Sequence, residues 1–568
     1  MSIAKAKPGA SAPNAIRVSS GDRWAARIAR LGASPKAVVT SPEPLWTGDA
    51  ASARRLASGL FLFGGALVEA KPGASPWDQS APTAAWEEAL HGFDWLDDLV
   101  ASSDPATQDA LKQWLYDWID RYGGGVGPGW RPDLTGRRLT RWICHAIILL
   151  NGAGPERSRA FFTAIGRQTR FLRRRWKTAP PGLPRFQAAA GLVYAGLALE
   201  GAGGATIREG IAALGWEAAT SVGDDGGLPS RNPEHLVEVF SILVWAKQSL
   251  MEAGEMVNEA HEAALDRLAG AIRAMRHGDG VLARFHGGGG GNPERIDRAL
   301  SVSEMRPHGR THHTMGFHRI ANGGTLVLFD GGAAPEGHWA TTVHASAFCF
   351  EASIGRRQLV VNCGPGARFG DEWRRAARAT AAHSGLTIDD MSSARLTKDE
   401  GLFSGASKFT CIREEDARAV RLIAEHDGYL KTHGLMHQRR ISLSPDGGDL
   451  RGEDRVIADA PGAQALFDQV AGPGTVPFTI RFHLHPDVEA DIFLAGGAVR
   501  LKTADDDVWV MRQLGGRLTI EDSVFLDEGR LTPRATKQIV VRAEAREYRG
   551  EVKWALRRAE ADRPRAEG

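Results

Sequence analysis

The stretch TVHASAFCFEASIG, residues 342–355, places a histidine at the head of a run in which residue character alternates. His344, Phe348 and Phe350 fall on one face of an extended chain, because successive side chains point to opposite sides. This period of two predicts a half-buried β-strand. An ionisable ring that shares a face with two phenylalanines is either a hydrogen-bonded core histidine or a group that the strand delivers to a site.

Further alternating stretches follow in the C-terminal half of the chain. They are bounded by turn-forming residues, as strands usually are. Consecutive strands without intervening helices favour an antiparallel β-sandwich. The stretches are GTLVLFDGG (324–332), RQLVVNCGPG (357–366), RAVRLIAEH (418–426), VPFTIRFHLHP (476–486), DVWVMRQL (507–514) and KQIVVRAEA (537–545).

The N-terminal half, from about residue 51 to residue 275, has the period of helices instead. In DALKQWLYDWIDRY, residues 109–122, two tryptophans stand one helical turn apart. RRLTRWICHAIILLNG, residues 137–152, predicts another helix, and the short loops suit antiparallel helix hairpins. The glycine run in HGGGGGNPERID, residues 286–297, is compatible with neither helix nor strand and marks a boundary between the halves.

Composition excludes several classes of protein. At 568 residues the chain is long enough for two or more domains. Its formal net charge is only +2, so no global field favours nucleic acid as a partner. No apolar run is long enough for membrane insertion. The basic N-terminus lacks the apolar core of a secretory signal, which by itself predicts a cytoplasmic protein.

The loop DDGGLPSRNPEHLVEV, residues 224–239, leads into an amphipathic helix. Asn232 before Pro233 predicts an N-cap followed by proline at the first helical position. Arg231 and His235 flank this start, where a loop can present them to a cleft. The alternative is a well-capped helix with no further role.

Three polar groups stand out in the sheet half: His344, Asn362 in LVVNCGPG, and His383 in RATAAHSGLTIDD, a string that also carries Arg378. Two histidines and an amide oxygen can hold a zinc ion, although asparagine is a weak ligand. The alternative is that both histidines are hydrogen-bonded core residues. Among the 16 tryptophans, Trp130 and others offer ring faces for sugars, but most are expected in the core.

The chain resembles the heparinase II/III family, whose members join an incomplete α/α toroid to an antiparallel β-sandwich. The resemblance rests on an ordered set of strings that covers nearly all of the chain. They are WEEALHGFDWLDDL, GPGWRPDLTGRRLTRWI and DGGLPSRNPE in the helical half, and VHASAFCFE, VVNCG, RATAAHSGLTIDD, HDGY, RFHLHP and VKWALRR in the sheet half. It implies an α+β multidomain fold with a toroid (46–285), a Gly-rich linker (286–311) and a sandwich (312–560). Because the N-terminus is rich in Ala, Ser and Pro, residues 1–45 are expected to form a flexible tail, and residues 561–568 are expected to form a second tail.

The resemblance also implies a function, the β-elimination of an acidic, uronate-containing polysaccharide or oligosaccharide. A base removes the proton next to the uronate carboxyl while a donor neutralises the carboxylate. His235 stands nearest the tyrosine that the family uses as base, and Arg231 suits neutralisation. Asn232, Trp130 and Arg378 are the substrate-binding candidates.

For the metal, the resemblance implies a structural zinc on His344, Asn362 and His383, where Asn362 replaces an aspartate of the family. The chain lacks the family's tyrosine and an Asn-His pair, so a second hypothesis stays open: a non-catalytic carbohydrate-binding or envelope protein that has kept the fold. A hydrolase on the same scaffold is a third hypothesis, for which Asp224 and Asp225 are the obvious candidate carboxylates, although a turn is the more common role of such a pair. By resemblance the location is the cell envelope or periplasm.

Overall fold

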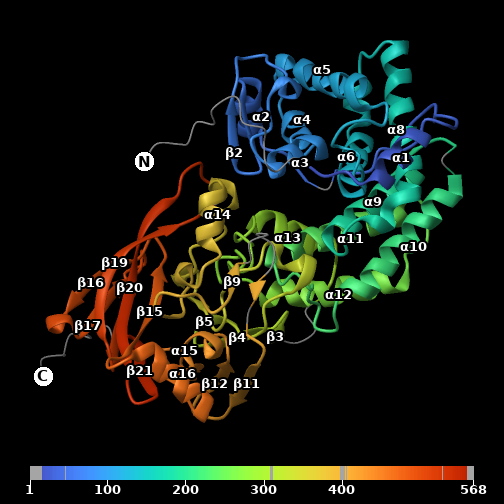
Figure 1. Ribbon diagram of the computed structural model, residues 1–568. Helices are drawn as coiled ribbons and strands as arrows, with labels where there is room; N and C mark the ends of the chain where they lie inside the picture. The colour runs from blue at the N-terminus through green and yellow to red at the C-terminus, as the bar shows by residue number, and fades with distance from the viewer. Residues whose placement is uncertain are drawn as a thin grey trace, which may run out of the picture. The chain divides into compact units, whose positions relative to one another are not determined.

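The computed structural model describes residues 16–44, 46–201, 203–306, 311–396, 403–404, 406–527 and 529–559. These residues form two compact units. The described residues of the first unit fall within 1–223, 237–268 and 297–305, and those of the second fall within 224–236, 269–296 and 306–568. Figure 1 follows the chain from helices in blue and green to strands in orange and red.

The described residues of the first unit are mainly helical, as their period predicts, and they also form a hairpin of β1 (Leu60–Phe63) and β2 (Ala66–Glu69). Its helices are α1 (Ser20–Ile28), α2 (Ala50–Ala57), α3 (Ala84–Gly92), α4 (Leu96–Val100), α5 (Pro105–Tyr122), α6 (Pro132–Cys144), α7 (Ala146–Leu150), α8 (Pro155–Arg175), α9 (Leu183–Ala198) and α10 (Gly203–Ser221). Parts of α11 (Pro233–Glu252), α12 (Glu259–Ala274) and α13 (Pro293–Val302) belong to each unit.

Local sequence explains where these helices begin and end. Helix α5 starts at a proline after Asp104, whose carboxylate accepts a hydrogen bond from the backbone N–H of Thr107 at 2.9 Å. The predicted helix over 137–152 is two helices, because the chain breaks at His145. The His145 ring is held 2.8 Å from the carboxylate of Asp97, which also accepts from Arg141.

Part of the segment expected as a flexible tail is folded. Helix α1 is capped by Ser19, and its Asp22 forms an ion pair of 2.7 Å with Arg175 of α8. Further along, the backbone N–H of Val39 donates to the carbonyl of Ala198 at 2.8 Å. Composition alone suggested disorder because the segment is rich in Ala, Ser and Pro, but these long-range contacts fix residues 16–44 onto the helices.

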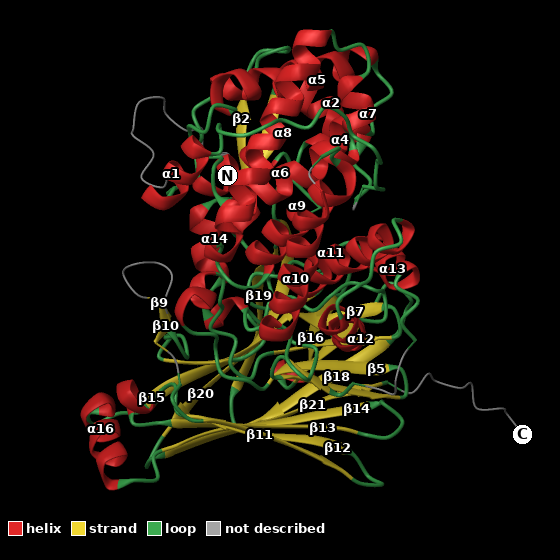
Figure 2. Ribbon diagram, turned by 90° about the vertical axis from the view of Figure 1, so that its right-hand side faces the viewer, coloured by secondary structure: helices red, strands yellow, loops and turns green. Residues whose placement is uncertain are grey.

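The second unit is an antiparallel β-sandwich, as predicted, and its buried core lies between two sheets. The eight-stranded sheet has the order β11-β12-β13-β14-β21-β18-β17-β16, and Figure 2 shows most of these strands side by side in yellow. Their bounds are β11 (Phe409–Glu415), β12 (Val420–His426), β13 (Met436–Leu443), β14 (Asp449–Ile457), β16 (Glu489–Phe493), β17 (Ala498–Lys502), β18 (Val508–Leu514) and β21 (Arg549–Arg558).

The other sheet follows the order β19-β20-β15-β7-β6-β5-β4-β3, and β8 also pairs with β15. Its strands are β3 (His313–Thr314), β4 (Phe317–Asn322), β5 (Thr325–Asp330), β6 (Phe350–Ile354), β7 (Arg357–Val361), β8 (Leu386–Ile388), β15 (Val476–Leu484), β19 (Arg517–Phe525) and β20 (Arg534–Ala545). A small pair, β9 (Arg395–Leu396) and β10 (Phe403–Ser404), and helices α14 (Asp371–Ala377), α15 (Leu430–His433) and α16 (Pro461–Ala471) complete the unit.

The strand predicted over 342–355 is wrong in its first half. Strand β6 begins only at Phe350, and Phe348 has a left-handed backbone with φ of 57°. The backbone N–H of Ala345 donates to the Arg378 carbonyl, and that of Phe348 donates to the Asp330 carbonyl, both at 2.9 Å. These bonds replace a regular ladder, so His344 lies in an irregular buried segment before the strand.

The glycine run is neither helix nor strand, but it is packed rather than a simple spacer. A Cβ on Gly288 would lie 2.8 Å from the side-chain oxygen of Asn232, and the N–H of Gly291 donates to the Glu234 carboxylate at 3.0 Å. The run therefore lies against the start of α11, and helix α13 follows it directly at Pro293. Close backbone approach explains why glycine is used here.

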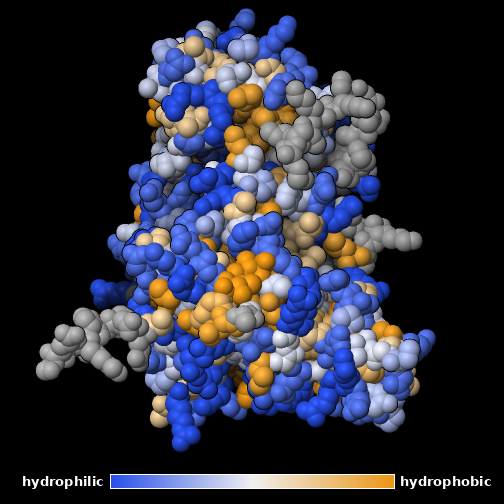
Figure 3. Space-filling view, turned by 90° about the vertical axis from the view of Figure 1, so that its left-hand side faces the viewer, coloured by the Kyte–Doolittle hydropathy of each residue, from blue (hydrophilic) through white to orange (hydrophobic). Residues whose placement is uncertain are grey.

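The described residues include no helix long and apolar enough to cross a membrane. On the face drawn in Figure 3, hydrophilic residues cover most of the surface and apolar ones gather toward the middle.

Candidate functional site

Arg231 is the centre of a buried polar cluster in the second unit. Its backbone is left-handed, with φ of 52°, just before α11. Its guanidinium donates four hydrogen bonds: Nε to the carbonyl of Met315 at 2.5 Å, Nη1 to two carbonyls at 2.9 and 2.7 Å, and Nη2 to the carboxylate of Asp330. The two carbonyls that accept from Nη1 belong to Gly332 and Ala333. A guanidinium has five N–H groups, so Arg231 is almost fully committed to protein partners.

Asp330, at the end of β5, gathers several groups around its carboxylate. The hydroxyl of Ser346 donates to it at 2.6 Å, and Nε2 of His286 stands 3.3 Å away. Burial alone would raise the pKa of Asp330, but Arg231, His286 and Ser346 together hold it well below its ordinary value. The cluster therefore contains a permanent carboxylate that the arginine neutralises.

His344 joins this cluster to His383. Nδ1 of His344 lies 3.0 Å from Nε2 of His383, and Nδ1 of His383 lies 2.8 Å from the carbonyl of Ala379. A carbonyl only accepts, so His383 carries its proton on Nδ1 and its Nε2 accepts the proton of His344. The backbone N–H of His344 donates to Nδ1 of His286 at 3.2 Å.

Both of these histidines are neutral at physiological pH. Burial, together with the neighbouring His383 and His286, lowers the pKa of His344 well below its ordinary value. Burial lowers the pKa of His383 to about 4. Neutral rings are what the hydrogen bond between them requires, because two imidazolium groups would both be donors.

A cavity of about 20 Å³ lies among the polar groups of this cluster. Such a volume holds about one water molecule and not a sugar ring. The polar side chains that line it are those of Arg231, His286, Asp330, His344, Ser346 and Ser393.

Asn362 does not complete a metal site with the two histidines. Its amide nitrogen donates to the carbonyl of Arg284 at 3.1 Å, and its oxygen accepts from the backbone N–H of Ser384 at 3.0 Å. Both ends of the amide are therefore occupied. Among the described residues, no group of three His, Cys, Asp or Glu side chains is placed to hold a metal ion. The predicted zinc site does not fit this geometry.

His235 lies in the first turn of α11 and is half-buried. Its Nδ1 is 3.0 Å from the hydroxyl of Ser230, and burial lowers its pKa to about 4. Asn232 has the capping role that the sequence predicts, since its side-chain oxygen accepts from the N–H of Glu234 at 2.9 Å. Its side chain is buried, so capping accounts for it without a ligand.

Trp130 and Arg378, predicted to bind substrate, are both buried. The indole N–H of Trp130 donates to the Tyr122 carbonyl at 2.8 Å, and its ring packs among Trp118 and other aromatic residues. Arg378 donates to the carbonyls of Val343 and Ala340, each at 2.9 Å, and so braces the segment before His344. Neither side chain is exposed to meet a sugar.

Sequence reasoning missed His286 and Asp330. His286 stands directly before the glycine run, and Asp330 ends an otherwise apolar strand. An acidic residue at the end of a buried strand was the available signal, because a buried carboxylate needs a partner.

Comparison with known proteins gives two findings along the sequence. The family model of the heparinase II/III-like C-terminal domain matches residues 304–555. The FtsZ-localized protein C of Caulobacter vibrioides is 30% identical over 539 residues, which cover 93% of this chain and 91% of that protein. The chain belongs to the heparinase II/III-like family.

Solved structures agree with this heparinase II/III-like assignment at the level of the fold. A crystal structure of heparinase III gives a TM-score of 0.69 at 12% identity and covers 95% of this chain and 89% of that one. A mutant heparan sulfate lyase from Pedobacter heparinus gives 0.60 at 14% identity, with 95% and 88% covered. The predicted fold class, an α/α toroid followed by an antiparallel β-sandwich, is confirmed.

Proposed function

We propose that this heparinase II/III-like chain acts together with FtsZ, as a non-catalytic member of its family that has kept the fold as a binding scaffold. The observation that carries the proposal is its 30% identity to an FtsZ-localized protein along 91% of that protein's length. Under this proposal the chain works where FtsZ assembles, and the periplasmic location that the resemblance implies stays a prediction.

The state of Arg231 supports a loss of lyase chemistry. A lyase must neutralise the uronate carboxylate so that the adjacent carbon can give up its proton. The Arg231 guanidinium already donates to three carbonyls and to Asp330, so a substrate carboxylate would have to displace these partners. Such a buried, paired arginine is a structural element rather than a free anion receptor.

The histidine cluster supports the same proposal. The rings of His344 and His383 are hydrogen-bonded to each other, and Nδ1 of His286 accepts from the backbone N–H of His344. The cavity beside them has room for about one water molecule. Polar groups in such a closed network specify the local fold.

The experiment is localisation of a fluorescent fusion at the native locus, before and after depletion of FtsZ. We expect a band that coincides with FtsZ and disperses when FtsZ is removed, and we expect the His235→Ala fusion to behave like the wild type. A diffuse signal, or a band that survives depletion of FtsZ, would overturn the proposal.

A second candidate function is the β-elimination of an acidic polysaccharide, which His235 favours. Its neutral ring is half-buried, and Ser230 holds its Nδ1. In that reaction the ring takes the proton next to the carboxyl, a carbon–carbon double bond forms and the glycosidic oxygen departs with a proton. Release of unsaturated uronate ends, measured by ultraviolet absorbance, tests this function. Binding of the same glycans without cleavage would support a carbohydrate-binding scaffold.

A further inference from the structure

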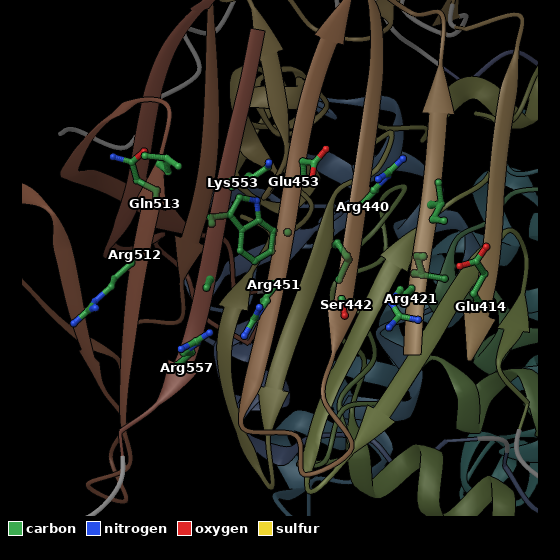
Figure 4. Close-up of a pocket in the computed structure, with 17 residues that line it drawn as sticks. Glu414, Arg421, Arg440, Ser442, Arg451, Glu453, Arg512, Gln513, Lys553 and Arg557 are labelled. Carbon is green, nitrogen blue, oxygen red and sulfur yellow. The ribbon is translucent and has the colours of Figure 1, made fainter. Parts of the chain in front are cut away.

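The outer face of the eight-stranded sheet carries an open groove of about 710 Å³, which is lined by residues of six strands (Figure 4). The groove crosses β11, β12, β13, β14, β21 and β18. Its basic side chains outnumber the two acidic ones, Glu414 and Glu453. They are Arg421, Arg440, Arg451, Arg512, Lys553 and Arg557.

Strand register places three of these arginines in one row. Arg421 is opposite Ser442, which is opposite Arg451 on the next strand. Arg451 is in turn opposite Ala555, which is opposite Arg512. Figure 4 shows Arg512, Arg451 and Arg421 following one another across the strands. Since neighbouring strands lie about 4.8 Å apart, the arginines repeat about every 10 Å, with a small residue between each pair.

The positive charge of the groove is only partly compensated. Neither Arg440 nor Arg512 forms an ion pair with any acidic residue in the described part of the chain. Arg421 forms an ion pair with Asp416, and Arg451 forms one with Asp449. The side chain of Arg451 nevertheless remains 59% exposed. Exposed pairs are weak, so they exchange readily for a ligand's carboxylates.

Apolar side chains lie at both ends of the adjacent row on the same face, which contains Arg440, Glu453 and Lys553. Ile423 is opposite Arg440 at one side, and Leu514, which is 73% exposed, is opposite Lys553 at the other. A ligand that fills the groove therefore gains by covering apolar surface as well as by pairing charges.

We propose that this groove binds an acidic amphipathic helix of a partner protein, laid across the strands. A helix rises 1.5 Å per residue, so acidic residues seven apart repeat about every 10 Å and match the arginine row. In an extended peptide, side chains on one face repeat about every 7 Å and do not match. Apolar residues on the same side of the helix would contact Ile423 and Leu514. The inference does not rest on the proposed function, because the groove is separate from the histidine cluster.

The test is fluorescence anisotropy of the full-length protein with a labelled model peptide of about 18 residues, long enough to cross the row as a helix. It carries three glutamates seven residues apart, leucines on the same side and a neutral background. A scrambled peptide of the same composition is the first control. We expect saturable binding that weakens with added salt, and scrambling should weaken it by about tenfold or more.

The matched protein variants separate the groove from general charge. Arg440→Glu/Arg512→Glu should lower affinity by at least about tenfold, whereas Lys537→Glu/Arg546→Glu, which makes the same charge change outside the groove, should not. If the first variant unfolds, Ser442→Trp fills the hollow between two arginines and should also block binding. Equal binding of the scrambled peptide, or no effect of the groove variants, would overturn the inference. So would a heparin oligosaccharide that occupies the groove more tightly than the peptide.

Discussion

His344 donates a hydrogen bond from Nδ1 to Nε2 of His383 over 3.0 Å, and the Ala379 carbonyl fixes the direction of this bond by accepting the only proton of His383. The pair links two segments that neither helix nor strand orders, the one before β6 and the one before β8. The histidine at the head of TVHASAFCFEASIG is therefore part of a polar network inside the fold, and its Nε2 is left as an acceptor.

Replacing the acceptor should destabilise the protein. In His383→Phe, the Nδ1–H of His344 and the carbonyl of Ala379 lose their partner in a buried place. Leaving a buried polar group unsatisfied costs about 1–3 kcal/mol. Urea denaturation should show this loss, and His338→Phe, at an exposed position, should change the unfolding free energy by less than about 0.5 kcal/mol. Equal stability of the two variants would mean that the pair is not formed.

Arg231→Met should have a larger effect, because it leaves the Asp330 carboxylate buried without its main partner. Breaking a buried ion pair by removing one member costs about 3–5 kcal/mol. The double variant Arg231→Met/Asp330→Asn should recover part of the loss, and a double-mutant cycle in urea measures the coupling. A stable Arg231→Met variant would show that the arginine is free to serve a ligand, which favours the lyase.

The buried histidines predict a dependence of stability on pH. Their pKa values in the folded protein are lowered, well below the ordinary value for His344 and to about 4 for His383. The unfolded chain therefore binds more protons between its pKa of about 6.5 and these lower values, and stability falls as pH falls through this window. Each such histidine contributes a slope of up to about 1.4 kcal/mol per pH unit.

Asp330 adds a second loss at lower pH. Its pKa is lowered in the folded state, so its contribution is present above the unfolded value of about 3.9 and declines below it. The free energy of unfolding, measured by urea denaturation at several pH values, should fall less steeply between pH 6.5 and 4 in His344→Gln/His383→Gln than in His338→Gln. Parallel slopes for the two variants would contradict neutral, buried rings.

The spacing of apolar residues predicted the fold, because the periods of helices and strands depend only on residues that are close together in the sequence. The run RAVRLIAEH became β12 with alternating burial, and DALKQWLYDWIDRY became the core of α5. The failures came from single long-range contacts. Asp97 holds His145 where α6 and α7 separate, and the turn at Phe348 removes the first half of the strand expected over 342–355.

The site was harder to predict, because residue type and spacing do not show which partner a side chain will find. Arg231 stands in a polar loop and suggested a ligand, but its left-handed backbone accompanies a side chain bound to Met315 and Asp330. The prediction that His344 and His383 lie close together is confirmed. The role predicted for Asn362 did not follow from the sequence, because its amide is hydrogen-bonded to two backbone groups.

Zinc binding should depend on the residue at position 362. The Asn362 amide is engaged at both ends, so we expect purified wild-type protein to hold well under one equivalent of zinc. Asn362→Asp replaces the amide with a charged oxygen ligand, which loses the bond to the Arg284 carbonyl and gains affinity for zinc beside the two histidines. Elemental analysis after dialysis measures both. Stoichiometric zinc in the wild type that is lost in His344→Ala would instead establish the predicted three-ligand site.

Lyase activity should be absent, and His235 gives the sharpest test of that expectation. The pure protein is incubated with heparan-type glycans, alginate and bacterial exopolysaccharides, and ultraviolet absorbance reports unsaturated uronate ends. His235→Ala removes the half-buried neutral imidazole at the start of α11, and Ser230→Ala removes the hydroxyl at its Nδ1. If the wild type is active, loss in His235→Ala with a smaller decrease in kcat for Ser230→Ala would identify His235 as the base. Silence of all three proteins, together with dispersal of the fusion on FtsZ depletion, is the result that a scaffold predicts.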